Sequence, residues 1–388
     1  MLVPGRIRVY PTDFLVEEIS LYPAKGEGAH LYVRFEKTAI TTDEAVRQLA
    51  AHAKVPVRDI GVAGMKDRHA VTIQTVSVPA PMSAAADDFD AHIRGFQTGE
   101  MRVLDATRHN NKLRTGHLRG NRFKLVVRDV PESGYADIEK AFLGIAEVGV
   151  PNAYGNQRFG SRGDNVERAL AWLGGGPGPR DFKQRRFLYS ALQSHIFNAV
   201  LEARLQEKTW NRAVTGDVLL REDRVLIGNS GDSLVQDDRS SRPGLRYCED
   251  AEQDQVAVQR GDYGPSGPMF GPDMKAPKGA VHELETRVCE GLLGTGFDWA
   301  KTSQYGEGTR RHLRLWVEDM HVRWLAASEP SGTDAQAGSG LGEGSVEVEF
   351  VLPRGAYATT VLSNVFQLTE GVSHAASSPA ATEIQETR

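Results

Sequence analysis

A glycine-rich turn that leads into an apolar strand is the feature that most constrains how this chain folds. Gly61 and Gly64 allow backbone angles that other residues resist. The segment beyond the turn has the composition of a strand, with Val71, Ile73 and Val76 as its apolar residues. Asp67 lies between the turn and this strand. The sequence therefore predicts that a carboxylate is presented at the edge of a sheet.

The neighbours of Asp67 are cationic. Lys66 and Arg68 flank it, and His69 follows. Nearby positive charge favours the ionised form of a carboxylate, which suits a nucleophile better than a general acid. From these residues alone, a solvated turn with a surface ion pair is the commoner arrangement, because charged turns are frequent and functional ones are rare.

Composition places the chain among soluble globular proteins. It has 388 residues, of which 40% are hydrophobic and 25% charged, and no apolar run approaches membrane-spanning length. This length allows two or three domains, each with its own core. The segment Met1–Tyr10 lacks the apolar stretch of a signal peptide, so we expect a cytoplasmic protein that does not contact membranes.

Metal and disulfide chemistry are not indicated. Cys248 and Cys289 are the only cysteines and lie far apart, which excludes a disulfide framework and a cysteine-rich zinc site. Each is expected to be an ordinary buried thiol. The histidines form no helical pair and no cluster with carboxylates at ligand spacing. We therefore expect no metal and no cofactor.

Basic residues gather in three clusters although the chain as a whole is acidic. The formal net charge is -5 and the pI is near 6.2, which does not describe a uniformly basic nucleic-acid binder. The clusters are Arg108, Lys112, Arg114, Arg119, Arg122, Lys124 and Arg128; Arg180, Lys183, Arg185 and Arg186; and Arg310, Arg311 and Arg314. Such clusters can hold phosphates, and the first contains no acid. The alternative for each is a solvated face.

Periodicity predicts a mixture of strands and helices without regular alternation. Residues 30–36 alternate as a half-buried strand, and Thr41 with Glu44 forms the capping box of a helix that follows. Further strands are expected at 101–105, 123–128 and 346–352, and helices at 136–147, 168–173 and 187–206. The glycine-rich run 174–179 lacks the ending of a phosphate loop. This order favours an α+β fold over a doubly wound sheet.

Five segments, in the same order along the chain, resemble those of the TruD family of pseudouridine synthases. The segment around Asp67 matches the family pattern Gly-x-x-Gly-x-Lys-Asp-x-x-Ala-x-Thr-x-Gln at every fixed position. The five are Asp13–Glu18, Gly61–Gln74, Lys112–Phe123, Val150–Gly160 and Leu352–Thr359. One departure is Ala153, which replaces the first of two aromatic residues and leaves Tyr154. The resemblance covers nearly the whole chain.

The resemblance implies a fold and a domain arrangement. The catalytic domain would have a mixed, largely antiparallel sheet of the pseudouridine-synthase type, built from residues 1–148 and 316–370. A second α/β domain, the TRUD domain, would be inserted at 149–315. By composition, residues 328–345 are expected to form a flexible loop and 371–388 a disordered tail.

The resemblance also implies an activity and its residues. Members of this family isomerise a uridine to pseudouridine in RNA, for bacterial members uridine 13 of a tRNA, and tRNA is the expected partner. The catalytic residue would be Asp67, with Arg8 as its paired cation and Lys66 in support. The residues expected to bind the flipped base are Phe14, Asn121 and Tyr357. Asp67 would attack C1′ or C6, or deprotonate C2′, and the sequence does not choose among these routes.

Two other functions remain open from the sequence. The first is a non-catalytic RNA-binding or chaperone protein that keeps the fold, against which the intact Asp67, Phe14 and Asn121 argue. The second is a glycoside or nucleoside hydrolase. Such an enzyme would need a second positioned carboxylate, for which Glu17 and Glu18 are the candidates.

Overall fold

The computed structural model describes residues 2–82, 86–160, 162–222, 224–225, 244–325 and 343–371. Most of the predicted flexible loop and all but the first residue of the predicted tail lie outside these ranges. Residues 343–345, which were assigned to that loop, instead begin a strand. Within the described ranges, no helix combines the length and the apolar composition needed to cross a membrane.

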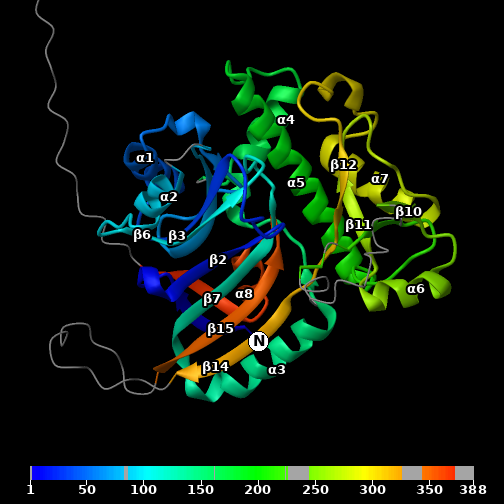
Figure 1. Cartoon of the computed structure of the whole chain (residues 1–388). Helices are drawn as coiled ribbons and strands as arrows, with labels where there is room; N and C mark the ends of the chain where they lie inside the picture. The colour runs from blue at the N-terminus through cyan, green and yellow to red at the C-terminus, as the bar shows by residue number, and fades with distance from the viewer. Residues whose placement is uncertain are drawn as a thin grey trace, which may run out of the picture.

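Ten strands of the described chain form one large sheet (Figure 1). Its main path runs β14-β15-β7-β2-β5-β3-β6, with β4 paired to β5, and β1 paired to β7 and β16. The strands are β1 (Val3–Ile7), β2 (Phe14–Ser20), β3 (His30–Thr38), β4 (Gly61–Val62), β5 (Val71–Pro79), β6 (Met101–His109), β7 (Leu118–Pro131), β14 (Glu318–Leu325), β15 (Glu343–Pro353) and β16 (Phe366–Glu370). Only β2 with β5 and β1 with β16 pair in parallel. The predicted mixed, largely antiparallel sheet is confirmed.

The alternation of apolar residues along β3 determines which face of that strand is buried. Leu31, Val33 and Phe35 are fully buried. Helices α1 (Thr42–Ala53) and α2 (Ala86–Arg94) cover this part of the sheet. The predicted capping box starts α1, because Thr41 Oγ1 accepts from Glu44 N at 3.2 Å and the Glu44 carboxylate accepts from Thr41 N at 2.7 Å. Local sequence therefore sets this half of the core.

The other half of the sheet packs against α3 (Tyr135–Val148) and α8 (Ala358–Leu362). One continuous hydrophobic cluster joins Phe142 of α3 and Val361 of α8 to β7 and β15. This packing fixes the end of β15 and the segment that leads from it into α8.

The described residues between 150 and 315 form a smaller sheet and four α-helices, which lie to one side of the large sheet (Figure 1). The smaller sheet has the order β10-β9-β11-β12. Its strands are β9 (Val218–Arg221), β10 (Leu245–Tyr247), β11 (Tyr263–Met269) and β12 (Thr309–His312). The helices are α4 (Asn165–Leu173), α5 (Phe182–Gln206), α6 (Ala251–Arg260) and α7 (Gly279–Leu293). The short strands β8 (Val150–Pro151) and β13 (Arg314–Leu315) pair where the chain leaves and rejoins the large sheet.

Several predicted elements are longer than the sequence suggested. Helix α5 begins at Phe182 rather than at 187, because the Asp181 side chain caps it by accepting from Lys183 N at 3.1 Å. Strands β6 and β7 likewise extend beyond the predicted ranges. Both cysteines are buried as expected, and burial raises the pKa of the Cys248 thiol to about 12 and that of Cys289 to about 11.

Candidate active site

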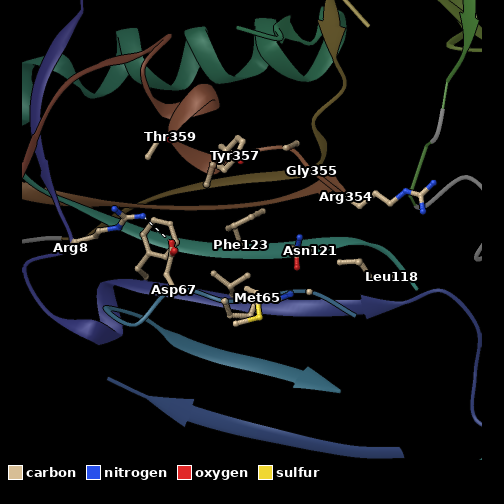
Figure 2. Close-up of a pocket in the computed structure, with 16 residues that line it drawn as sticks. Arg8, Met65, Asp67, Leu118, Asn121, Phe123, Arg354, Gly355, Tyr357 and Thr359 are labelled. Carbon is tan, nitrogen blue, oxygen red and sulfur yellow. Dashed lines mark hydrogen bonds and ion pairs between the residues drawn. The ribbon is translucent and has the colours of Figure 1, made fainter. Parts of the chain in front are cut away.

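All six residues singled out from the sequence line one cavity of about 280 Å³ on the large sheet. They are Arg8, Phe14, Lys66, Asp67, Asn121 and Tyr357. Figure 2 shows Asp67 and Met65 on one side of this cavity and Tyr357 on the other, with Phe123 and Asn121 between them. We call it the Asp67 pocket.

The register between β2 and β7 forms the floor of the pocket. Val16 lies opposite Phe123, and Phe14 lies opposite Leu125. Because side chains alternate between the faces of a strand, Phe14 and Val16 share a face with Phe123 and Asn121. The rings of Phe14 and Phe123 are 6.4 Å apart and nearly perpendicular, at 79°. The floor is therefore apolar, with a single amide.

Asp67 reaches the pocket because β5 pairs in parallel with β2. Val71, the first residue of β5, lies beside Leu15. The loop that precedes β5 therefore ends next to the start of β2, where Phe14 lies. The Asp67 side chain is 63% exposed, and its Oδ2 accepts from Arg8 Nη2 at 3.1 Å.

Arg8 is held in place by three contacts. Besides Asp67, its guanidinium donates to Glu370 Oε1 at 3.1 Å and lies 4.6 Å from the centre of the Phe14 ring. Its side chain is only 16% exposed. The backbone has φ 57°, a left-handed conformation that costs a non-glycine residue about 1 kcal/mol or more and is most common at functional sites. The predicted pairing of Arg8 with the Asp67 carboxylate is present.

Lys66 points away from Asp67, contrary to the prediction that it supports the charge of this carboxylate. Its Nζ donates to Glu18 Oε2 at 2.8 Å, and the two side chains are 7% and 1% exposed. Burial raises the pKa of Glu18, and the Lys66 ammonium opposes that rise. Arg68 pairs with Glu44 at 3.3 Å instead. Neighbours in the sequence therefore do not supply the cation of Asp67.

A buried lysine that sequence reasoning missed holds the backbone of Asp67. Lys37 Nζ donates to the carbonyl oxygen of Asp67 at 2.9 Å and to that of Ile40 at 2.7 Å. Burial lowers the pKa of Lys37 to about 8, although the Asp67 carboxylate acts in the opposite direction. The signal was present in the sequence, because Lys37 continues the alternation of the buried face of β3.

The remaining motif residues also hold the loop from within. Lys66 N donates to Thr42 Oγ1 at 2.9 Å, and Thr42 donates to Gln74 Oε1 at 3.1 Å. Ala70 is fully buried. The Gly64–Ala70 loop is thus anchored to β3, β5 and the first turn of α1, which fixes the position of Asp67.

Two groups in the pocket are placed so that a ligand could contact them. Asn121 Oδ1 is buried without a hydrogen-bond partner among the described residues. Tyr357, the residue before α8, is 52% exposed although it lines the cavity. A buried amide oxygen that accepts nothing is costly unless a ligand donates to it. Met65, Phe123 and Arg354 also line the pocket, and the sequence analysis did not assign them a role.

The structure gives no support to a hydrolase. Glu18 is buried against Lys66, and Glu17 pairs with Arg34. Neither glutamate lines the Asp67 pocket, so neither is placed as a second carboxylate. Among the residues that the structure describes, no group of three or more histidine, cysteine or carboxylate side chains could hold a metal ion.

Four of the seven cations in the first basic cluster are paired with acids, contrary to the expectation that no acid compensates it. Segments distant in sequence bring these acids. The ion pairs are Arg108 with Asp90, Arg122 with Asp319 and Glu349, Lys124 with Glu347, and Arg128 with Asp13. These four cations are therefore poorly suited to hold phosphates, whereas Lys112 and Arg119 donate to backbone carbonyl oxygens.

Comparisons with known proteins identify the family of this chain. The family model described as tRNA pseudouridine synthase D (TruD) matches residues 3–170 and 181–365. Curated relatives named tRNA pseudouridine synthase D include one from Anaeromyxobacter sp. (strain Fw109-5), 37% identical over 94% of this chain and 93% of its own length. Another, from Thermus thermophilus, is 34% identical over 97% of this chain and 93% of its own.

A solved structure shares the fold. It is described as the putative tRNA pseudouridine synthase D from Methanosarcina mazei, with a TM-score of 0.68, 24% identity and 94% of each chain covered. The family model and the curated relatives span nearly the full chain, the relatives at 34% and 37% identity. The chain belongs to the TruD family of tRNA pseudouridine synthases.

Proposed function

We propose that this protein isomerises a uridine to pseudouridine in tRNA, at position 13, with Asp67 as the catalytic carboxylate. The observation that carries the proposal is the placement of Asp67. Its carboxylate lines a pocket whose floor carries the rings of Phe14 and Phe123. The floor also carries the Asn121 Oδ1 atom, which has no hydrogen-bond partner among the described residues. The family membership of the chain supports the same reaction.

The reaction breaks the bond from C1′ to N1 of uracil and forms one from C1′ to C5, while C5 releases its hydrogen as a proton and N1 takes up a proton. It needs no oxidant and no net water. Asp67 acts either by attacking the sugar or base or by removing the proton from C2′, and both routes use an unprotonated carboxylate. Arg8 supplies the adjacent counter-charge and orients this carboxylate.

The remaining residues bind the base once it leaves its stack. Asn121 Oδ1 accepts the N3–H of uracil, which satisfies the buried oxygen. Phe14, Phe123 and Tyr357 contact the ring and keep water from the intermediate. A volume of about 280 Å³ is at the lower end of the roughly 300–1,000 Å³ typical of small-molecule sites, as expected for one base and part of its sugar.

The two sheets support a division into domains, which we also propose. Residues 1–148 and 316–370 would form the catalytic domain, and 149–315 the inserted TRUD domain. The smaller sheet and its helices have hydrophobic clusters of their own, and the β8–β13 pair joins the two parts. A tRNA substrate also implies a cytoplasmic location.

Tritium release tests the reaction directly. A tRNA transcript that carries 5-tritiated uridine should release label with the wild-type protein, because C5 loses its hydrogen. Asp67→Asn should release none. Chemical mapping of pseudouridine in the product would then identify the position.

The same assay separates the alternatives. Binding of tRNA without release of label by the wild-type protein would favour the non-catalytic RNA-binding function and contradict our proposal. Release of free uracil would favour a hydrolase. Equal release by Asp67→Asn and wild type would remove Asp67 from the mechanism.

A further inference from the structure

A second cavity, of about 410 Å³, adjoins the Asp67 pocket and has no role in the proposed reaction. The two cavities share the wall formed by Arg354, Gly355 and Ala356. On its other sides the second cavity is lined by Asn152 and Tyr154, from the fourth family-like segment, and by residues of β12 and β13. We call it the Arg311 cavity.

Cations outnumber acids in the lining of this cavity. It contains five basic residues, Arg310, Arg311, His312, Arg314 and Arg354, and one carboxylate, Glu222. Three of these residues lie beside acids: Arg310 binds Glu285 at 2.7 Å, and Arg314 and His312 lie 3.4 Å and 3.5 Å from Glu222. Positive charge that is left without an acid therefore centres on Arg311.

Arg311 is a half-buried guanidinium held by neutral groups. Its Nη2 donates to Asn152 Oδ1 at 2.6 Å, and its guanidinium lies 4.2 Å from the centre of the Tyr154 ring. Within the described ranges, its Nε is buried without a hydrogen-bond partner. Burial lowers the pKa of Arg311, and the interactions that oppose this lowering come from Tyr154 and Tyr357.

A second arginine shares the same ring. The Arg158 guanidinium lies 5.5 Å from the centre of Tyr154 and donates to Ser194 Oγ at 3.1 Å. Among the described residues, no carboxylate lies within ion-pair distance of Arg158 or Arg311. Removing cations from water without a counter-charge costs free energy, so a site of this kind is completed by an anion.

We propose that the Arg311 cavity binds the phosphodiester group next to the uridine that occupies the Asp67 pocket. The proposal rests on the proposed function, since it assumes an RNA strand that delivers its base across the shared wall. A guanidinium presents a fork of donors that matches phosphate oxygens, and Asn152 with Tyr154 holds this fork in one orientation. The fourth family-like segment thus helps to bind the RNA backbone, whereas the segment around Asp67 supplies the carboxylate for the reaction.

Binding of tRNA by Arg311→Gln tests the proposal. Dissociation constants are measured by fluorescence anisotropy with an unmodified tRNA transcript, in the Asp67→Asn background so that no reaction occurs. We expect Arg311→Gln to weaken binding about tenfold, as the loss of one charge-assisted contact predicts. A plot of the logarithm of the association constant against the logarithm of the salt concentration should also become less steep, by about 1 in slope. The matched control Arg323→Gln removes an exposed arginine of β14 and should change neither quantity.

Neutral phosphates sharpen the test. Each of the two phosphates that flank the isomerised uridine is replaced in turn by an uncharged methylphosphonate, in tRNA assembled from synthetic fragments. One replacement should weaken binding to Asp67→Asn protein about tenfold and leave its binding to the Arg311→Gln version unchanged. If each phosphate replacement weakens binding by the same factor in the Arg311→Gln version as in its parent, Arg311 contacts neither phosphate, and the proposal is overturned.

Stability distinguishes a ligand site from a structural one. A cation that lacks a counter-charge contributes little to folding, so Arg311→Gln should unfold at the wild-type temperature or above it. Arg311→Lys should retain part of the affinity. A marked loss of stability in Arg311→Gln with unchanged RNA affinity would assign Arg311 a structural role and overturn the proposal.

The outcomes also separate this inference from the proposed function. If the wild-type protein releases no tritium, the proposed function fails whatever Arg311 does. If it releases tritium while Arg311→Gln binds tRNA as tightly as its parent, with the same salt dependence, only the inference fails.

Discussion

The Gly64–Ala70 loop has two faces, and the charged groups of its adjacent residues Lys66 and Asp67 point to opposite ones, although both residues line the Asp67 pocket. On the pocket face, Asp67 is 63% exposed and pairs with Arg8. On the core face, Lys66 is 7% exposed and pairs with a glutamate that is 1% exposed. Both pairs have good geometry, yet only one can be reached by a substrate.

The difference teaches what each ion pair can do. A buried pair keeps its geometry because separating its charges in a poorly solvated region costs several kcal/mol. An exposed pair of this kind is worth about 0–1 kcal/mol, so the carboxylate can exchange its partner for a reacting group. Lys66 therefore helps to fix the loop, and the Asp67 carboxylate stays accessible to a ligand.

Asp67→Asn should have the largest effect, and it should lower activity without lowering stability. The variant removes the reacting carboxylate, and we expect tritium release from tRNA to fall by a factor of about 10⁴ or more. The free energy of unfolding, measured by urea titration, should stay within about 1 kcal/mol of wild type because the pair is exposed. A variant that is both inactive and unstable would show that Asp67 also belongs to the core face.

Lys66→Met should have the reverse effect. It leaves the Glu18 carboxylate buried without a cation, so we expect a loss of about 3–5 kcal/mol in the free energy of unfolding. Urea titration measures the loss. The double variant Lys66→Met with Glu18→Leu should recover most of it, because no charge then remains buried. Failure of the second substitution to restore stability would mean that the pair acts through something other than charge.

Arg8→Gln removes the cation on the pocket face. Because Arg8 orients the carboxylate in the proposed mechanism, we expect kcat to fall roughly 10- to 100-fold, which corresponds to about 1.4–2.7 kcal/mol of lost transition-state stabilisation. Single-turnover tritium release measures it, and Arg8→Lys is expected to retain more activity. An unchanged kcat in Arg8→Gln would show that Asp67 needs no partner to be oriented.

Lys37 gives the smallest effect, a dependence of stability on pH. Its pKa is about 8 in the folded protein against an ordinary value of 10.5. Between these values the unfolded chain binds a proton that the folded protein does not, so stability should rise with pH, by at most about 1.4 kcal/mol per pH unit. Below pH 8 both states are protonated and this dependence vanishes.

Lys37→Met is the control for that dependence. Urea titrations of both proteins at pH 7, 8, 9 and 10 should show a steeper rise for wild type than for the variant. Parallel curves would mean that Lys37 keeps its ordinary pKa despite its burial.

Local patterns predicted much of the fold and the loop of the site. Alternation identified β3, the capping box started α1 at its observed residue, and the glycine-rich turn led into β5. The motif around Asp67 also identified the residue that opens into the pocket. These features depend on residues close together in sequence, which is why the sequence alone reveals them.

Partners that are distant in sequence could not be predicted. The sequence placed Lys66 beside Asp67, but the pairing of β2 with β5 turns its side chain toward Glu18. The basic residues of β7 looked unpaired until β14 and β15 brought acids beside them. Conversely, the sequence grouped Arg311 with Arg310 and Arg314 as one basic cluster, and it could not show that acids from distant segments pair with Arg310 and Arg314.

The parallel pairing of β1 with β16 has a consequence for how the protein is made. Arg8 follows β1, and its partner Glu370 ends β16, 362 residues later in the chain. A chain emerging from the ribosome can build α1 and its neighbouring strands early, since their contacts are local. The cation of Asp67 gains its full set of contacts only after the last described strand has been synthesised. A chain that lacks β16 would therefore hold Arg8 by two of its three contacts, and we expect its Asp67 pocket to be less well ordered.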